Sequence, residues 1–289
     1  MVLGIFLLRF TAGTVLGMMS GSTHANGARF LVSALLWESA VVAVYLFNGA
    51  MDVAEDRTNR SRRPVARGAI APETAARCAG LFAVLALAGA VVSRPPLTVA
   101  VLVLLLLGFL YSGPPLYLKR YSIATVLIAG SGGLLTYYAG YTVTGGSSGR
   151  GEAAVFALSM TLWMVVVGAG AKDLPDVAGD LAAGRRTRVV VHGEKRVLTE
   201  VACVALAIGA AFLVAVLYLA PALAWPAAVT LVGAVCVAAI SLGRISRGGQ
   251  KSSRLPYQAF MATQYATHLV LLGSVSFAPV FRALHLSWW

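Results

Sequence analysis

Apolar residues run in long blocks along this chain, and short polar stretches separate the blocks. A helix needs about 20 apolar residues to cross the hydrocarbon core of a bilayer. Nine blocks meet this length, at residues 3–22, 30–50, 73–93, 97–117, 122–143, 153–172, 197–219, 222–243 and 259–281. The pattern predicts an all-α integral membrane protein with nine transmembrane helices, folded as a single domain over residues 1–289.

The composition supports a membrane location and argues against nucleic acid as a partner. Of the residues, 58% are hydrophobic and only 12% are charged, which is more apolar than a water-soluble domain sustains. The formal net charge is +12. The basic residues mark loops, however, and no basic stretch is interleaved with aromatics on a polar background, so no nucleic-acid surface is expected.

Lysine and arginine residues are concentrated in every second loop, and this distribution predicts the orientation of the chain in the membrane. The loops after the second, fourth, sixth and eighth spans carry seventeen of them, whereas the alternate loops carry only Arg29, Arg94 and Arg150. By the positive-inside rule the basic loops and the N-terminus are cytoplasmic, and the C-terminus lies outside. We therefore expect a multi-pass protein of the cell membrane.

The aspartates occupy two short segments, each at the predicted cytoplasmic end of a span. The first segment carries Asn48, Asp52 and Asp56. At about 100° per residue, positions i, i+4 and i+8 share one face of a helix. The second segment carries Asp173, Asp176 and Asp180, which also share a face if the segment is helical. Pro175 is expected to kink that segment or to open a new helical turn.

Carboxylates grouped at a membrane surface repel one another unless a cation binds between them. Oxygen ligands favour Mg²⁺, which binds one or two carboxylates and bridges to substrate phosphates. Basic residues that could contact the remaining phosphate oxygens lie beside both segments. The sequence therefore indicates a Mg²⁺–diphosphate site.

These segments resemble the motifs of the UbiA superfamily of intramembrane prenyltransferases. The resemblance rests on Asn48-x3-Asp52-x3-Asp56, Asn59 to Pro64, Tyr111 to Pro115, Lys119-Arg120, and Lys172-Asp173-x2-Asp176-x3-Asp180. It covers nearly the whole chain. One departure is Arg9-Phe10, where many members have Arg-Pro, which weakens the case for a role of Arg9.

The resemblance implies nine helices around a central cavity, with the two aspartate motifs facing each other across its cytoplasmic mouth. It implies that six residues hold Mg²⁺ and the diphosphate: Asn48, Asp52, Asp56, Asp173, Asp176 and Asp180. Among these, Asp52, Asp56, Asp176 and Asp180 are the expected catalytic residues. The expected phosphate contacts are Arg63, Lys119, Arg120 and Lys172.

The expected reaction is ionisation of an allylic prenyl diphosphate and capture of the cation by an acceptor. Tyr137, Tyr138 and Trp163 are candidates to stabilise the cation through their π faces, although packing is the commoner role of such residues. The form of the second motif resembles branches that use aromatic or tetrapyrrole acceptors. We therefore expect transfer to a small aromatic acid or phenol.

Three alternatives remain open at this stage. Intramolecular capture of the cation would make the protein a terpene cyclase, and the acceptor could be another lipophilic molecule such as a tetrapyrrole or quinone precursor. An ion-coupled transporter would also use intramembrane aspartates. It would place them near the bilayer midplane, whereas these cluster at span ends beside arginines.

Overall fold

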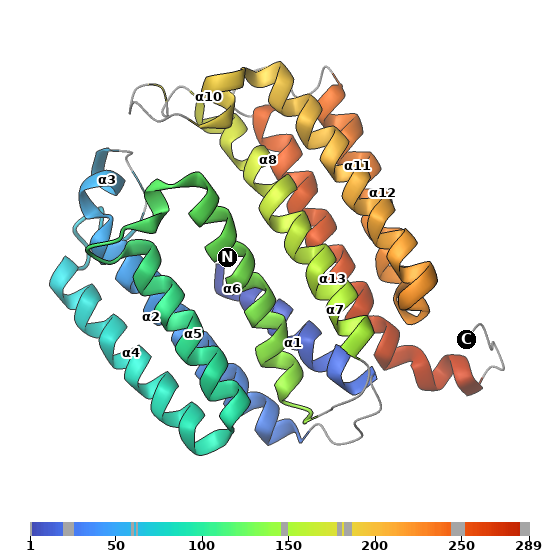
Figure 1. Ribbon diagram of the computed structural model, residues 1–289, viewed down its shortest axis with the longest axis horizontal. Coiled ribbons are helices and arrows are strands. Elements are labelled where there is room, and N and C mark those ends of the chain that lie inside the picture. Colours follow the sequence, from blue (N-terminus) through green and yellow to red (C-terminus); the bar gives the residue numbers. More distant parts are fainter. Residues whose placement is uncertain are drawn as a thin grey trace. The chain divides into compact units, whose positions relative to one another are not determined.

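The computed structural model describes residues 2–19, 26–58, 61, 63–145, 150–177, 181, 187–243 and 252–283. Every regular element within these ranges is helical, which confirms the predicted fold class (Figure 1). Seven segments are long and apolar enough to cross a membrane. A shorter apolar helix spans Leu3–Met19. The count of nine spans and the central cavity stay predictions.

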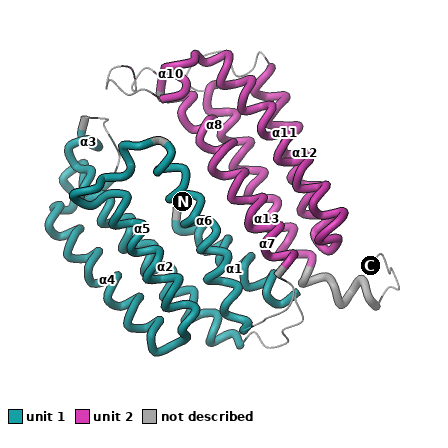
Figure 2. Tube along the Cα trace, in the orientation of Figure 1, with its two compact units in different colours: residues 1–148 teal, residues 149–289 magenta. Residues whose placement is uncertain are grey.

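Contacts within the chain group it into two compact units, residues 1–148 and 149–289 (Figure 2). Folding as one domain therefore stays a prediction, and each unit is described by itself. Unit 1 contains α1 (Val2–Met19), α2 (Gly27–Met51), α3 (Val53–Thr58), α4 (Pro72–Ser93), α5 (Pro95–Ser112), η1 (Leu118–Arg120) and α6 (Ser122–Thr142).

In unit 1, α2 packs against both α4 and α5, and these three helices lie side by side in Figure 1. Pro72 and Pro95 open α4 and α5, where the missing proline N–H leaves no intrahelical bond unmade. Phe10 and Trp37 are fully buried and stack with their ring centroids 6.5 Å apart. These rings join α1 to α2 in the core.

Helix α1 crosses α6 where each helix has a glycine, Gly13 on α1 and Gly140 on α6. A Cβ atom at Gly13 would collide with the carbonyl oxygen of Tyr137, and one at Gly140 would collide with that of Phe10. The Thr14 hydroxyl donates a hydrogen bond to the Gly140 carbonyl oxygen at 3.0 Å. Gly13, in the first apolar block, and Gly140 therefore allow close packing of these two helices.

The described residues of unit 2 form ten helical segments, of which η2 is a π-helix. They are α7 (Arg150–Leu162), η2 (Trp163–Gly168), α8 (Ala169–Asp173), η3 (Leu174–Asp176), α10 (Arg188–His192), α11 (Glu194–Leu219), η4 (Pro221–Leu223), α12 (Ala224–Leu242), η6 (Ser252–Arg254) and α13 (Leu255–Ala283). Helix α12 packs against α11 and α13.

The helix that leads to the second aspartate motif is irregular. The chain passes from α7 through the π-helix η2 into α8, and then tightens into the 3₁₀ turn η3. Pro175 lies at the start of that turn, so the predicted change of helical geometry at this proline is confirmed. π-helical segments occur frequently beside functional sites.

Candidate functional site

The first aspartate motif lies where α2 ends and α3 begins. Asp52 caps α2 and donates its backbone N–H to the Asn48 carbonyl oxygen at 3.0 Å, and Asp56 donates in the same way to Asp52 at 2.8 Å. The two turns therefore follow each other despite the break between the helices. The Asn48 side-chain amide donates to the Asp52 carboxylate at 2.9 Å. Asp52 is only 9% exposed.

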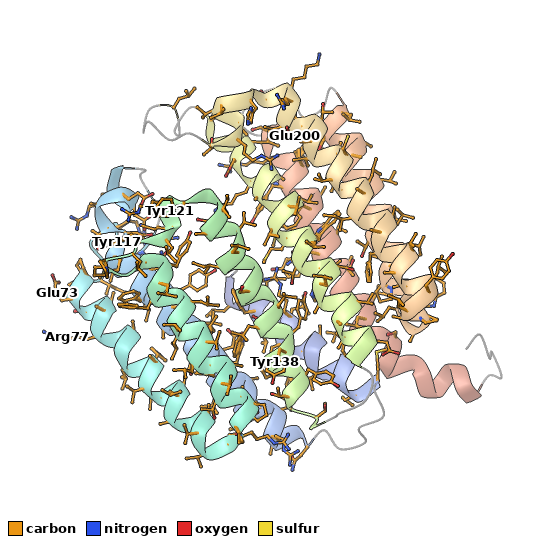
Figure 3. The ribbon with its side chains drawn as sticks, in the orientation of Figure 1. Glu73, Arg77, Tyr117, Tyr121, Tyr138 and Glu200 are labelled. Atoms are coloured by element: carbon orange, nitrogen blue, oxygen red, sulfur yellow. The ribbon has the colours of Figure 1, made fainter. Side chains whose placement is uncertain are left out.

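Lys119 reaches this motif from the connection between α5 and α6. Tyr117 has a φ of 42°, a left-handed conformation that a non-glycine residue rarely adopts, and it turns the chain into the short helix η1. The Thr125 hydroxyl donates to the Lys119 carbonyl oxygen at 3.1 Å. Figure 3 labels Tyr117 and Tyr121, which flank η1. The backbone of this turn is thus fixed on both sides of Lys119.

The ammonium of Lys119 joins two carboxylates. It donates hydrogen bonds to Asp52 Oδ1 and, at 3.0 Å, to Glu55 Oε2. The lysine side chain is 20% exposed, and its burial by itself lowers its pKa. The hydrogen bonds and charges of the two acidic residues outweigh burial, so the pKa of Lys119 is raised overall. Lys119 is therefore a cation throughout the neutral range.

Arg63 is the second cation that contacts the motif. Its guanidinium donates to the Asn48 side-chain oxygen at 3.1 Å and to Asp56 Oδ2 at 3.0 Å. It also lies 3.9 Å from Asp52 Oδ2. Five of the predicted site residues therefore meet in unit 1: Asn48, Asp52, Asp56, Arg63 and Lys119. We call this group, together with Glu55 and Ser112, the carboxylate cluster.

Glu55 and Ser112 were not predicted to belong to the site. Ser112 accepts a hydrogen bond of 2.8 Å from the Asn48 amide, which orients that amide between serine and Asp52. Ser112 lies within the Tyr111-to-Pro115 segment, so its motif was a usable signal. Glu55 falls outside the four-residue spacing, and its position beside Lys119 depends on a contact across 64 residues of sequence.

Arg120 takes a different direction from Lys119. It is exposed, and its guanidinium lies 5.0 Å from the centroid of the Tyr121 ring, a cation–π contact. The structure thus brings Lys119 to the carboxylate cluster and places Arg120 on the neighbouring aromatic ring. A phosphate contact by Arg120 stays a prediction.

The second aspartate motif belongs to unit 2. Lys172 is exposed and Asp173 is half-buried at the end of α8. The backbone of Asp176 ends η3, whereas its side chain and the whole of Asp180 lie outside the described residues. The predicted meeting of the two motifs around one ligand therefore stays a prediction.

The residues of the carboxylate cluster suit a hard cation. Within the described ranges, no group of three or more His, Cys, Asp or Glu residues is arranged to hold a metal ion. Mg²⁺ does not need such a cage, since it binds through one or two carboxylates and keeps several waters. Asp52, Asp56 and the Asn48 amide oxygen supply suitable ligands. Here their oxygens contact Lys119 and Arg63.

The three aromatic candidates have different surroundings. Tyr137 is 3% exposed in unit 1, whereas Tyr138, labelled in Figure 3, is exposed. In unit 2, Trp163 is fully buried, stacks on Phe260 with centroids 6.0 Å apart, and donates its indole N–H to the Phe260 carbonyl oxygen at 3.4 Å. Trp163 thus has a packing role. A π contact with a cation by these residues stays a prediction.

Comparison with known proteins gives a consistent result along the chain. Residues 10–264 match the model of the UbiA prenyltransferase family. The digeranylgeranylglyceryl phosphate synthase of Methanopyrus kandleri is 32% identical over 87% of this chain and 94% of its own length. The corresponding enzyme of Halobacterium salinarum is 32% identical over 83% of this chain and 80% of its own length. Homogentisate phytyltransferase 1 of Arabidopsis thaliana is 30% identical over 78% of this chain and 62% of its own length.

Solved structures share the fold at low sequence identity. A UbiA homolog from Archaeoglobus fulgidus bound to DMAPP and Mg²⁺ aligns with a TM-score of 0.62 and 17% identity. The alignment covers 93% of this chain and 96% of that one. A structure of digeranylgeranylglyceryl phosphate synthase aligns with a TM-score of 0.67 and 14% identity, over 95% of this chain and 99% of that one.

Proposed function

The chain belongs to the UbiA prenyltransferase family and is an intramembrane prenyltransferase, and on that premise we propose that it transfers an isoprenoid chain from a prenyl diphosphate to a small aromatic acid. The observation that carries the proposal is the carboxylate cluster. It joins three carboxylates, one amide, one hydroxyl and two cations at the end of an apolar helix. Carboxylates suit the metal and cations suit the phosphate oxygens of one substrate.

A divalent metal, which we propose to be Mg²⁺, fits the oxygen ligands of Asn48, Asp52 and Asp56. When bound, it neutralises charge on the diphosphate and so makes the diphosphate a better leaving group. The proposal adds Asp173, Asp176 and Asp180 as ligands from the second motif. Support for Mg²⁺ comes from the ligand chemistry and from the related Archaeoglobus fulgidus protein, which binds Mg²⁺ with DMAPP.

The reaction begins with cleavage of the bond between the prenyl C1 atom and the diphosphate oxygen, whose electron pair leaves with the diphosphate. Lys119 and Arg63 exchange their carboxylate partners for phosphate oxygens and stabilise the charge that develops there. The aromatic ring of the acceptor then supplies the electron pair for the new bond to C1. Loss of a proton from the attacked ring carbon restores aromaticity. Apolar helices exclude water, which would otherwise capture the cation.

The acceptor class rests on the second motif and on the related homogentisate phytyltransferases, whose substrate is an aromatic acid. A second candidate has a specific basis. The reported relatives that match over 80% or more of their own length are digeranylgeranylglyceryl phosphate synthases, so a glyceryl ether phosphate is the alternative acceptor. In that case the nucleophile is a hydroxyl oxygen, and its proton is lost as the ether forms.

The proposed orientation follows from the loop charges. The carboxylate cluster, the basic loops and the N-terminus face the cytoplasm, and the C-terminus lies outside. In this orientation the water-soluble diphosphate leaves on the side where the cluster lies, while the isoprenoid chain stays in the bilayer.

Product analysis tests the proposal. Purified protein in lipid nanodiscs is incubated with Mg²⁺, with geranyl, farnesyl or geranylgeranyl diphosphate, and with 4-hydroxybenzoate, homogentisate or a glyceryl ether phosphate. We expect a prenylated aromatic product, identified by mass spectrometry, and loss of activity with EDTA. Asp52→Ala and Asp176→Ala should abolish transfer, whereas the exposed Glu73→Ala should not.

Three results would contradict parts of the proposal. Prenylation of the glyceryl ether phosphate alone would replace the aromatic acceptor by the second candidate. A cyclic hydrocarbon formed without any acceptor would make the protein a cyclase. Diphosphate release that persists in Asp52→Ala would show that the carboxylate cluster has no role in the reaction.

A further inference from the structure

Arg9 is a buried cation that the carboxylate cluster does not use. It lies on α1 and is only 4% exposed. Among the described residues, no carboxylate forms an ion pair with it. Its guanidinium interacts instead with the side chain of Tyr137 on α6, which is itself 3% exposed. A neutral hydroxyl satisfies one donor but leaves the positive charge uncompensated.

An uncompensated charge among apolar helices is costly, and such residues usually serve function. The surroundings of Arg9 hold it in place. The next residue, Phe10, packs on Trp37, and the glycine crossing of α1 and α6 fixes the Tyr137 backbone. The guanidinium and the hydroxyl are therefore prepositioned donors.

The depth of Arg9 can be bracketed along α2. Phe6 contacts Tyr45 and Phe10 contacts Trp37, so Arg9 lies level with the segment between those two α2 residues. Asp52 follows Tyr45 by seven residues and Trp37 by fifteen, which at 1.5 Å per residue corresponds to roughly 10–22 Å. Helical side chains lean toward the helix N-terminus, and in α1 that direction leads toward the level of Asp52. The cation thus lies on the apolar side of the carboxylate cluster.

We propose that Arg9 and Tyr137 form a binding site for the anionic group of the acceptor, a carboxylate or a phosphate. This inference rests on the proposed function, because it assigns the acceptor's charge to the same reaction. An isoprenoid tail is apolar and cannot form an ion pair with a guanidinium at this depth. Both candidate acceptors carry an anion, and an anion would accept hydrogen bonds from the guanidinium and from the Tyr137 hydroxyl.

The site gives the acceptor an orientation. With its anion held by Arg9, the reactive ring carbon or hydroxyl of the acceptor faces back toward the carboxylate cluster, where the prenyl C1 atom is released. The departure at Phe10 from the Arg-Pro pair does not affect this role, because the residue that follows Arg9 serves packing on Trp37.

Equilibrium binding without prenyl diphosphate tests the proposal. In one arm, calorimetry compares 4-hydroxybenzoate with the neutral 4-hydroxybenzamide. In the other, it compares a glyceryl ether phosphate with the same ether alcohol. In at least one arm we expect the anion to bind about 10- to 100-fold more tightly, which is the range of one or two charge-assisted hydrogen bonds. The arm that shows this ratio identifies the carboxylate or the phosphate.

The variants separate binding from packing. Arg9→Gln should reduce the ratio to about one, Arg9→Lys should keep part of it, and Tyr137→Phe should lower it several-fold. Arg94→Gln is the matched control, because Arg94 is a half-buried arginine of unit 1 that donates to the Thr142 carbonyl oxygen at 2.9 Å. It should leave the ratio unchanged. Prenyl diphosphate affinity should stay within about twofold in all four variants.

The proposal is overturned if the wild-type ratio is about one in both arms, or if no anion binds. It is equally overturned if folded Arg9→Gln keeps the wild-type ratio, since Arg9 would then serve packing alone. If Arg9→Gln does not fold, the wild-type and Tyr137→Phe ratios decide. Because the assay needs no catalysis, these failures differ from failure of the proposed function, which would appear as absent prenyl transfer despite selective anion binding.

Discussion

Replacing Lys119 by methionine should change catalysis and metal affinity in opposite directions. Methionine keeps the length of the side chain and removes the charge. In the structure the Lys119 ammonium contacts the carboxylates of Asp52 and Glu55. Asp52 is buried, with 9% of its surface exposed, whereas Glu55 is exposed. In the proposed reaction the same charge stabilises the leaving diphosphate. The substitution therefore removes an interaction that stabilises the transition state. It also removes the cation that competes with Mg²⁺ for the Asp52 carboxylate.

The magnitudes follow from these contacts. Loss of one positioned charged donor to a developing anion costs about 3–4 kcal/mol, which corresponds to a fall in kcat of roughly 10²- to 10³-fold. For the metal, the charge-assisted hydrogen bond between Lys119 and Asp52 contributes about 1.5–3 kcal/mol net. Part of this is retained by water in the variant, so the Mg²⁺ concentration for half-maximal activity should fall about 5- to 30-fold. Glu55 adds little because it is exposed.

The assay is diphosphate release in nanodiscs over a Mg²⁺ titration, with the acceptor that product analysis identifies. Arg120→Met is the matched control, because Arg120 is adjacent in sequence but lies on the Tyr121 ring. It should change kcat by less than about threefold. Two results would refute the reasoning: a Lys119→Met variant that needs more Mg²⁺ than the wild type, or a loss in Arg120→Met as large as in Lys119→Met.

Three further predictions concern packing, pH and the two motifs. Gly140→Val should destabilise the protein by about 2–4 kcal/mol in thermal unfolding because it strikes the α1 backbone, whereas Gly132→Val on the same helix meets open space and should be nearly neutral. The raised pKa of Lys119 means that its stabilising contribution is complete below the unfolded pKa near 10.5 and is lost only as pH rises through the higher folded pKa. The melting-temperature difference between wild type and Lys119→Met should therefore stay constant from pH 7 to about 10. Finally, Asp52→Asn and Asp176→Asn should combine non-additively in Mg²⁺ affinity if both motifs share a ligand, and additive losses would separate them.

Much of the fold could be predicted because it depends on local sequence. Span length follows from apolar runs, and the start of α4 at Pro72 and the 3₁₀ turn at Pro175 follow from proline geometry. The close crossing at Gly13 also follows from spacing, since only glycine lets two backbones approach so closely. The π-helix at Trp163–Gly168 had no such signal, because a change of hydrogen-bond register leaves the apolar pattern intact.

For the site as well, the residues grouped by local helical periodicity could be predicted, and those that depend on contacts distant in sequence could not. Asn48, Asp52 and Asp56 share a face through helical periodicity, so one short segment was enough to group them. Glu55 could not be found in this way, because it joins the site through Lys119, and Lys119 arrives by a left-handed turn at Tyr117. The different directions of Lys119 and Arg120 depend on that same turn. The sequence places both cations equally near the site, and only the backbone distinguishes them.

The pairing of cations with carboxylates explains how this acidic site can exist at the edge of a membrane. Asp52 is buried, and a buried charge is costly unless an opposite charge compensates it. Lys119 and Arg63 provide that compensation, and both come from segments outside α2, so it forms only when unit 1 is folded. In the proposed reaction a metal–diphosphate ligand brings positive charge for the carboxylates and negative charge for the cations. Each charged side chain then exchanges one partner for another of the same sign. In the proposed reaction the cluster therefore binds a highly charged substrate without leaving its own buried charges uncompensated, whereas the buried cation Arg9, which has no carboxylate partner among the described residues, gains an anionic partner from the proposed acceptor.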